Sequence, residues 1–345
     1  MQLKEFFRTI LFSDDFEVEG ITDFSFEQSR LIFENYAENG GMKFDKEKNT
    51  YKVKFEKSGN FSLDKVPLLL PIRNMPDLLK YTLNNLVSNN AEEMVNIVVI
   101  DDRSDPSLKS LVSEFDSVSY IRCDYDSGFN YAMLVNIGSF IMKRMQFSEV
   151  IFWNSDMYLP DNSTLKELIT RHRKNKPVLS GTKLLYPEKN WKGERFGVKA
   201  ENGEIDYSIQ GKVQYGGSGF NFANNGLSFF HSKVGAQKED LYVNCDKGVY
   251  VNNGAYCMTD LEWLANVGGL NPSFAKIFND IDICLRAIAD RRQVHYYGKD
   301  IFLYHEESTN LNSIGEFKKD HQFVSDIMLF SKIWSIPNFN NAVRF

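Results

Sequence analysis

Between residues 66 and 153, the hydrophobic positions form short continuous runs that alternate with amphipathic segments. The apolar runs have the length of buried strands: VPLLLPI (66–72), NIVVIDD (96–102), VSYIRCD (118–124) and EVIFW (149–153). The segments between them have helical spacing over 75–89, 107–115 and 129–145. Pro76 stands in the first turn of the first helix, where its missing N–H costs no hydrogen bond. Alternating strands and helices predict an α/β fold with a mostly parallel sheet flanked by helices.

The pattern changes on either side of this region. Residues 24–38 have helical spacing, Gly40 and Gly41 end that helix, and residues 42–55 alternate like a β-hairpin. We therefore expect a small N-terminal α+β accessory module over residues 1–63, a main domain over 64–315 and a C-terminal helix within 316–345.

Beyond residue 160 the strand–helix alternation loosens. The spacing predicts a helix over 164–175 and a strand over 178–186. Residues 187–250 are rich in Gly, Asn and aromatic residues, which favours short strands and loops. A final helix is expected over 317–334, with its apolar face formed by Phe317, Ile327, Phe330 and Trp334.

Composition and charge exclude several classes of protein. The chain of 345 residues has a net charge of −6, so it lacks the basic field that collects nucleic acid. Its four cysteines form no CxxC pair and are expected to be reduced thiols. No apolar stretch approaches the roughly 20 residues that span a bilayer, and the N-terminus does not resemble a signal peptide. We expect a cytoplasmic protein with at most peripheral contact at the inner face of a membrane.

Three of the apolar runs end in acidic or imidazole side chains. NIVVIDD ends in Asp101 and Asp102, the stretch VIFWNSD places Asp156 just beyond its strand, and DIFLYHEES carries His305 at the end of its apolar run. In an open α/β sheet, ligands bind outside the carboxyl ends of the strands. Each of these acids alone could cap a turn, but three strand ends together favour a shared site. We interpret Asp101 as orienting its loop.

A fourth acidic cluster lies where a loop enters a helix. FNDIDICLR places Asn279, Asp280 and Asp282 at this point, and one of them could serve as a helix N-cap. Asp282 could also pair with Arg286 one turn later. Together with the strand-end groups, the cluster indicates a site for a divalent cation and a phosphorylated ligand. Oxygen ligands with one imidazole suit Mn or Mg better than zinc.

The motifs, taken in order, resemble those of family 2 inverting glycosyltransferases with the GT-A fold, such as bacterial polysaccharide, rhamnosyl- and galactosyl-type transferases. The resemblance rests on VPLLLPIRN, VVIDDRS, GFNYAMLVNIG, FWNSDMYLP, GAYCMTDLEWLANVGGLNPSF, FNDIDICLR and YHEES. It implies a Rossmann-like sheet in which residues 64–160 form a nucleotide-binding half and residues 161–315 an acceptor-binding half. It also implies transfer of a sugar from a nucleotide-diphosphate donor, with uracil as the expected base, to a hydroxyl of a glycan. Assembly of a bacterial surface polysaccharide would fit the family.

The resemblance also implies a set of site residues. The nucleotide pocket would begin with Pro71, Arg73 and Asn74, and Asp102 would bind the base. Asn154, Ser155 and Asp156 stand at the DXD motif, whose last acid holds a divalent metal, Mn or Mg, under the diphosphate. His305 falls where some members have a further metal ligand. Asp280 stands at the acid of the ED motif, the expected general base.

Three positions depart from the family pattern. Asn154 replaces the first acid of the DXD motif, Asn279 replaces the glutamate of the ED motif, and Tyr131 replaces an arginine that would contact phosphate. Asp282 is an alternative base. The departures leave a second class of protein open, a non-catalytic scaffold built on a glycosyltransferase-like fold. A glycoside hydrolase with two carboxylates is a further alternative, although it would leave His305 beside the acids unexplained.

Overall fold

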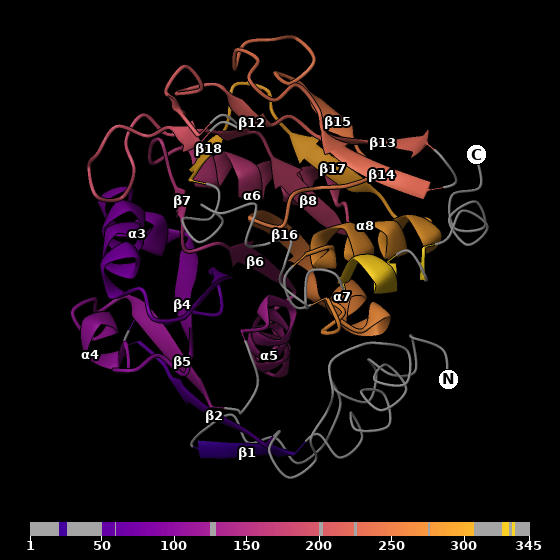
Figure 1. The fold of residues 1–345 in the computed structure, drawn as a ribbon. Coiled ribbons are helices and arrows are strands. Elements are labelled where there is room, and N and C mark those ends of the chain that lie inside the picture. The colour runs from indigo at the N-terminus through magenta and orange to yellow at the C-terminus, as the bar shows by residue number, and fades with distance from the viewer. Residues whose placement is uncertain are drawn as a thin grey trace.

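The computed structural model of the chain is built around one large, mixed β-sheet (Figure 1). It describes residues 21–25, 50–58, 60–124, 129–199, 203–223, 226–274, 277–306, 326–330 and 333–334. Within these residues the large sheet has ten strands in the order β1-β2-β5-β4-β3-β6-β16-β8-β17-β15.

The parallel core of this sheet confirms the fold class expected from the apolar runs. Its strands are β3 (Val66–Ile72), β4 (Val95–Asp102), β5 (Val118–Asp124) and β6 (Glu149–Trp153). All three strand pairs among them are parallel. Their carboxyl ends therefore lie at one edge of the sheet, as the strand-end acids require.

One reversed strand joins this core to the second half of the sheet. It is β16 (Tyr256–Asp260), which runs antiparallel both to β6 and to β8 (Leu179–Thr182). Next come β17 (Val294–Tyr297), parallel to β8, and β15 (Asp246–Gly248), antiparallel to β17. Because β16 is reversed, its first residue pairs with Trp153, the last residue of β6.

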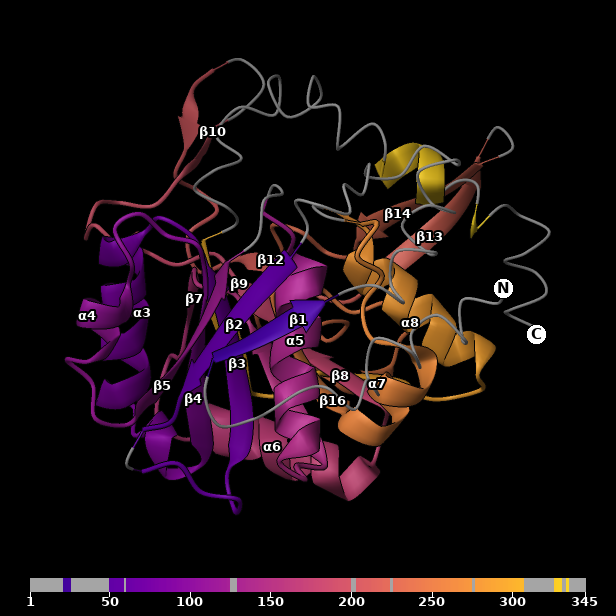
Figure 2. The same cartoon turned by 90° about the horizontal axis from the view of Figure 1, so that it is seen from below.

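Helices cover both faces of the sheet (Figure 2). On one face lie α3 (Pro76–Ser88), α4 (Lys109–Val112) and α6 (Thr164–Asn175), and on the other α5 (Tyr131–Arg144), α7 (Leu261–Val267) and α8 (Asn279–Ala289). Successive residues of β3 point to opposite faces: Leu68 and Leu70 pack in one apolar cluster and Leu69 in the other. Burial on both faces explains why the strand is continuously apolar.

A smaller sheet lies beside the carboxyl ends of the main strands. It consists of β12 (Val213–Tyr215), β9 (Leu184–Leu185), β18 (Leu303–His305) and β7 (Met157–Tyr158), in that order. The strand expected over 178–186 is divided at Lys183, with β8 in the large sheet and β9 in the small one. The remaining short elements are η1 (Ala91–Glu93), β10 (Val198–Lys199), β11 (Ile205–Asp206), β13 (Ser218–Ala223) and β14 (Gly226–His231).

The two ends of the chain are only partly described. Strand β1 (Ile21–Ser25) pairs with β2 (Thr50–Glu56), and β2 pairs with β5, so both extend the large sheet. The expected helix over 24–38 lies mostly outside the described residues, and the boundary at residue 63 stays a prediction. Near the C-terminus residues 326–330 are helical. Phe330 and Trp334 are buried there, whereas Ile327 is 39% exposed, so Ile327 does not share their buried face.

Among the described residues, none of the helices combines the length and the apolar character needed to cross a bilayer.

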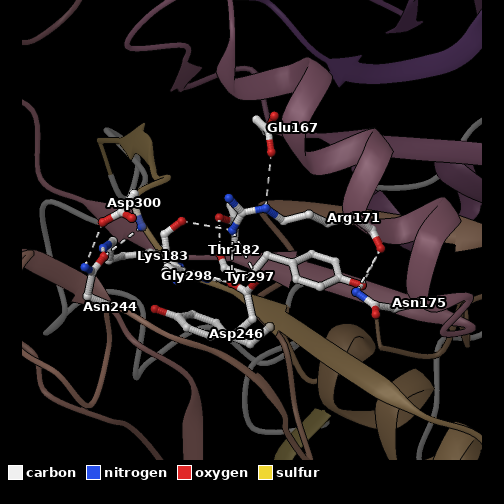
Figure 3. Close-up of polar contacts among 12 residues, drawn as sticks. Glu167, Arg171, Asn175, Thr182, Lys183, Asn244, Asp246, Tyr297, Gly298 and Asp300 are labelled. Atoms are coloured by element: carbon white, nitrogen blue, oxygen red, sulfur yellow. Dashed lines mark hydrogen bonds and ion pairs between the residues drawn. The ribbon is translucent and has the colours of Figure 1, made fainter.

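A polar network fixes the loop before β15 to the ends of β8 and β17 (Figure 3). The buried ammonium of Lys183 donates to the Lys238 carbonyl at 2.8 Å and to Asn244 Oδ1 at 2.9 Å. Arg171 on α6 donates to both carboxylate oxygens of Asp246, at 3.1 and 3.2 Å. These bonds hold a loop of the second half at the same sheet edge as the acids.

Candidate functional site

The loop after β4 is organised by Asp101. This buried carboxylate accepts hydrogen bonds from the Ser104 and Leu108 amides at 2.8 and 3.2 Å, from the Tyr120 hydroxyl at 2.5 Å and from Arg122 at 3.0 Å. Burial alone would raise its pKa, but the hydrogen bonds from Ser104 and Tyr120 outweigh burial and lower it. Asp101 thus orients the loop, in keeping with the sequence interpretation.

Asp102 and Arg73 meet at the ends of neighbouring strands. The Asp102 carboxylate is fully buried and lies 3.7 Å from Arg73 Nη1 and 3.2 Å from Arg103 Nε. Pro71, the next-to-last residue of β3, pairs in register with Ile100 of β4. The expected nucleotide-pocket residues therefore share one edge of the sheet.

Asn74 ties the two loops at this edge together. It has a positive φ of 54°, its amide donates to Ser104 Oγ at 2.9 Å, and its side-chain oxygen accepts from the Asp105 amide at 2.9 Å. Asn tolerates this left-handed conformation better than most side chains. The side chain expected to bind a nucleotide thus also fixes the loop after β4.

The turn after β6 is held from two sides. The Asn154 amide donates to the Ala255 carbonyl at 2.9 Å, which links the turn to the loop before β16. On the other side the Thr82 hydroxyl of α3 donates to the Ser155 carbonyl at 2.5 Å. This support fixes the position of Asp156, the next residue.

Asp156 and His305 lie together, as their positions at strand ends predict. His305 Nε2 is 3.3 Å from Asp156 Oδ1, and both side chains are about nine-tenths buried. They meet because β18 pairs with β7, and the Glu306 amide also donates to the Asp156 carbonyl at 3.1 Å.

Gln214 on β12 holds the His305 ring on its far side. Its amide nitrogen donates to the His305 carbonyl at 3.2 Å, so its oxygen faces His305 Nδ1 at 2.6 Å. The oxygen can only accept, which places a proton on Nδ1, so the ring in its neutral form directs the Nε2 lone pair toward Asp156.

The chemistry of this pair fits a divalent cation. A carboxylate and a neutral imidazole oriented through its other nitrogen are a common pair of metal ligands. In the part of the chain that the structure describes, no cluster of three or more His, Cys, Asp or Glu side chains is arranged to hold a metal. Mg²⁺ and similar ions often keep waters and bind substrate phosphates, so two protein ligands are compatible with such an ion.

Glu306 adds a second buried carboxyl beside Asp156. It accepts a hydrogen bond from the Tyr158 hydroxyl at 2.7 Å and is only 2% exposed. Burial, with the negative charge of Asp156, raises the pKa of Glu306 to about 7 against the opposing hydrogen bonds. The sequence interpretation missed Glu306, because it follows His305 outside any strand-end acidic motif.

Asp280 borders a small, partly open cavity. The cavity wall also contains Tyr131, Asn253, Gly254 and Cys257. Asp280 Oδ2 accepts from the Gly254 amide at 2.9 Å and Oδ1 from the Ile281 amide at 2.8 Å. Burial raises the pKa of Asp280, while these two amides favour the charged form. Each of the two Asp280 oxygens accepts one of these hydrogen bonds and keeps a second lone pair for a further donor.

The neighbouring Asp282 is engaged elsewhere. It is fully buried, pairs with Arg286 one turn later at 2.8 Å, and accepts from Trp334 Nε1 at 2.9 Å. The i+4 pairing expected from the sequence is confirmed. Asn279 is buried too, and its side chain faces the Phe274 carbonyl at 3.4 Å. Of the acids in this cluster, Asp280 is the one that lines the cavity.

The stretch FNYAMLVNIG at the start of α5 holds the loops around Asp280. Asn130 caps the helix by accepting from the Met133 amide, and donates to the Pro272 carbonyl at 2.7 Å. Asn136 binds both the amide and the carbonyl of Leu270, at 2.8 and 2.7 Å. These asparagines explain why polar residues occur within an otherwise apolar helix.

Two further side chains at the site were not expected from the sequence. Gln214 lies in the irregular region between residues 187 and 250, where no periodicity singles it out. His231, at the end of β14, stands edge-on to Tyr215 with a ring-centroid distance of 5.2 Å, and its charge would lower the pKa of Asp280. Only the three-dimensional pairing of distant strands brings either residue to the site.

Asp102 at the end of β4 and Asp156 just after β6 lie at one edge of the large sheet, and β18 of the small sheet adds His305 there. In open α/β sheets, ligands bind at this edge. Residues 68–230 match the model of glycosyl transferase family 2.

Two further comparisons describe more distant similarity. Over 139 residues the chain is 25% identical to the O-antigen biosynthesis protein RfbC of Myxococcus xanthus, and this match covers 40% of the chain and 10% of RfbC. The chain thus spans a small part of that relative's length. A crystal structure of GalNAc-T7 with UDP, GalNAc and Mn²⁺ superimposes with a TM-score of 0.49 and 11% identity, over 70% of this chain and 43% of that one.

Proposed function

We propose that the protein is an inverting glycosyltransferase that moves a sugar from a nucleoside-diphosphate donor, a UDP-sugar, to a hydroxyl of a glycan acceptor. The observation that supports this proposal best is the presence of two separate acidic groups. Asp156 lies in a buried pair with His305, 3.3 Å away, and Asp280 borders a cavity. An acid that binds the leaving group and another that accepts a proton are the two parts such a transfer needs.

The donor would bind across the ends of β3, β4 and β6. Pro71, Arg73 and Asn74 would line the nucleotide pocket, and the buried Asp102 carboxylate would accept a hydrogen bond from the base. Arg73 keeps about a third of its side-chain surface exposed, which leaves it accessible to a ligand. Asn154 and Ser155 would lie beside the diphosphate.

Asp156 and His305 would hold a divalent cation, Mn²⁺ or Mg²⁺, between the protein and the diphosphate. When bound, such an ion stabilises the negative charge that develops on the departing nucleoside diphosphate. The Nδ1–H bond to Gln214 keeps the His305 ring in the orientation and tautomer that ligation requires.

Asp280 would act as the general base. As the acceptor oxygen forms its bond to the anomeric carbon, its proton passes to the Asp280 carboxylate. The bond from the anomeric carbon to the diphosphate oxygen breaks on the opposite face, and its electron pair leaves with the nucleotide. The raised pKa of Asp280 makes it a stronger proton acceptor than an exposed aspartate, while the hydrogen bonds from the Gly254 and Ile281 amides favour its ionised form.

The acceptor is proposed to be a glycan of a bacterial surface polysaccharide. The match to glycosyl transferase family 2 and the similarity to the O-antigen biosynthesis protein RfbC support this proposal. A cytoplasmic location, with at most peripheral contact with the inner face of the membrane, stays a prediction from the sequence.

The test separates donor binding from turnover. UDP release from a panel of UDP-sugars is measured with Mn²⁺, and UDP binding is followed by calorimetry. Asp280→Asn is expected to lower kcat by roughly 10²–10⁴-fold with UDP binding unchanged. Asp156→Ala is expected to abolish metal-dependent UDP binding. Asp290→Asn, at the exposed far end of the same helix, is the matched control.

The outcomes distinguish the enzyme from a scaffold. Normal turnover in Asp280→Asn would overturn the assignment of the base. Metal-dependent UDP binding without turnover on any donor would instead favour a non-catalytic binding protein. That alternative would also account for Asn154 and Asn279, which replace acids of the family motifs.

A further inference from the structure

Tyr131 occupies the position at which the family pattern has an arginine, yet its contact is internal. It is the first residue of α5, and its hydroxyl donates to the Gly254 carbonyl at 3.1 Å. Burial raises the pKa of Tyr131, and the carboxylates of Asp280 and Asp156 raise it further. The phenol therefore stays protonated and keeps its ability to donate. Tyr131 also lines the cavity that Asp280 borders.

The peptide groups of Gly254 and Ala255 connect these halves. The backbone amide of Gly254 donates to Asp280 Oδ2 at 2.9 Å. The carbonyl of the following residue, Ala255, accepts from the backbone amide of Asn154 at 2.9 Å. A Cβ on Gly254 would stand 3.0 Å from the Asp280 Cβ and 3.3 Å from Oδ2. The loop thus packs directly against the carboxyl group, with no side chain between them.

We propose that Tyr131 is a positioning residue for Asp280, which it orients by fixing the Gly254 peptide. The proposal rests on the proposed function, in which Asp280 accepts the acceptor proton. The Gly254 carbonyl and amide lie on opposite sides of one residue. A donor that holds the carbonyl therefore restricts the rotation of the backbone that aims the amide at Asp280.

Loss of the Tyr131 hydroxyl has two expected consequences. The Asp280 carboxylate loses order, so it accepts the proton less efficiently and kcat falls. The hydrogen bond from the Gly254 amide, which stabilises the charged form of Asp280, also weakens. The pKa of Asp280 therefore rises, and the acidic limb of the pH profile of kcat moves to higher pH. Within the described residues, the titratable groups around Asp280 are His231, Cys257, Cys284, Tyr215 and Tyr131 itself, and Tyr131→Phe changes none of the other four.

The experiment uses the full chain with Tyr131→Phe, and Tyr207→Phe as the matched control on an exposed loop. We expect kcat to fall about five- to tenfold, the size of one lost hydrogen bond, while the donor KM and calorimetric UDP affinity stay within twofold. Unchanged kcat in folded Tyr131→Phe would overturn the proposal. A proportional loss of UDP affinity would also overturn it, because Tyr131 would then bind the donor.

A second variant tests the path through the loop. Gly254→Ala inserts a methyl against Asp280, so it is expected to lower kcat as well, and the double variant with Tyr131→Phe should be no worse than the lower single variant. Fully multiplicative losses would mean that the two residues act independently, which refutes the mechanism. If Tyr131→Phe folds poorly, the kcat of Gly254→Ala alone still tests the contact between the loop and Asp280, and an unchanged kcat in that variant would overturn the proposal.

A titration of Asp280 separates this inference from the proposed function. The Asp280 carboxyl is followed by carbon NMR in wild type and Tyr131→Phe, with Asp280→Asn to assign the signal. A higher Asp280 pKa in Tyr131→Phe supports the positioning contact even if Asp280→Asn remains active, in which case only the base assignment fails. An unchanged Asp280 pKa overturns the positioning contact.

Discussion

The hydrogen bond between Gln214 and His305 gives the sharpest test of the metal site. Gln214→Leu removes the oxygen that lies 2.6 Å from His305 Nδ1. Gln214 is only 2% exposed. Water cannot readily replace this acceptor. The ring is then free to place its proton on Nε2, where Asp156 Oδ1 at 3.3 Å would accept it. A cation would have to displace that proton before binding.

The expected effect on metal affinity follows from this competition. Loss of a hydrogen bond that orients a ligating imidazole typically weakens metal binding ~10–100-fold, which corresponds to about 1.4–2.7 kcal/mol. Gln214→Glu keeps an acceptor for Nδ1–H and is expected to retain most of the affinity. Gln237→Leu, on an exposed loop, is the matched control for the substitution itself.

The assay is Mn²⁺ binding in the presence of UDP, measured by calorimetry and by electron paramagnetic resonance of free Mn²⁺. Thermal melting of each apoprotein confirms folding. Wild-type Mn²⁺ affinity in folded Gln214→Leu would refute the orienting contact. Equal loss in the Leu and Glu variants would point instead to general disruption of β12, and no binding to wild type would refute the metal proposal itself.

Three further predictions concern stability. The pKa of His172 is lowered to about 4, chiefly by burial, so wild type should lose up to ~3 kcal/mol as the pH falls from 6.5 to 4; urea unfolding across that range should show no such loss in His172→Gln. Asp101→Asn breaks the buried pair with Arg122 and should cost ~2–4 kcal/mol in urea unfolding at pH 7, and a cost below 1 kcal/mol would contradict its organising contacts. Asn136→Leu leaves the Leu270 amide and carbonyl without their partner and should cost ~2–4 kcal/mol, whereas an unchanged melting temperature would refute the clamp.

The sequence pattern predicts the parallel strands of the first half of the fold, and it also predicts the sheet edge at which the candidate site lies. The four apolar runs and the helices between them are predicted because burial on both faces makes each strand continuously apolar. Parallel strands then bring Asp102 and Asp156 to one edge without any knowledge of tertiary contacts. The meeting of Asp156 and His305 is the most distant contact that this reasoning anticipates.

The contacts that the sequence does not reveal depend on pairing between distant short strands. Gln214 reaches His305 because β12 and β18 both flank β9, and each of these strands has only two or three residues. Such strands are too short to show a period of two. A glutamine also carries no charge that would mark it as a site residue.

Tyr131 illustrates a different limit. A family pattern suggests which ligand contact is lost when tyrosine replaces arginine, but not which internal contact is gained. That contact depends on the loop before β16, which is more than 120 positions away in the chain.

The reversal of β16 determines which loop changes would alter chemistry and which would alter only stability. In the parallel strands the chain meets the ligand edge as it leaves a strand, but in β16 it does so as it enters. Lengthening the segment before Tyr256 would therefore separate Asn154 from Asp280, because Ala255 and Gly254 link these two residues. An insertion after Asp260, at the opposite edge, would disturb the N-cap of α7 and the hydrogen bond from the Leu261 amide to the Ser148 carbonyl, both far from the acids. If the proposed transfer is correct, the segment before the reversed strand is the natural target for changing acceptor choice by design.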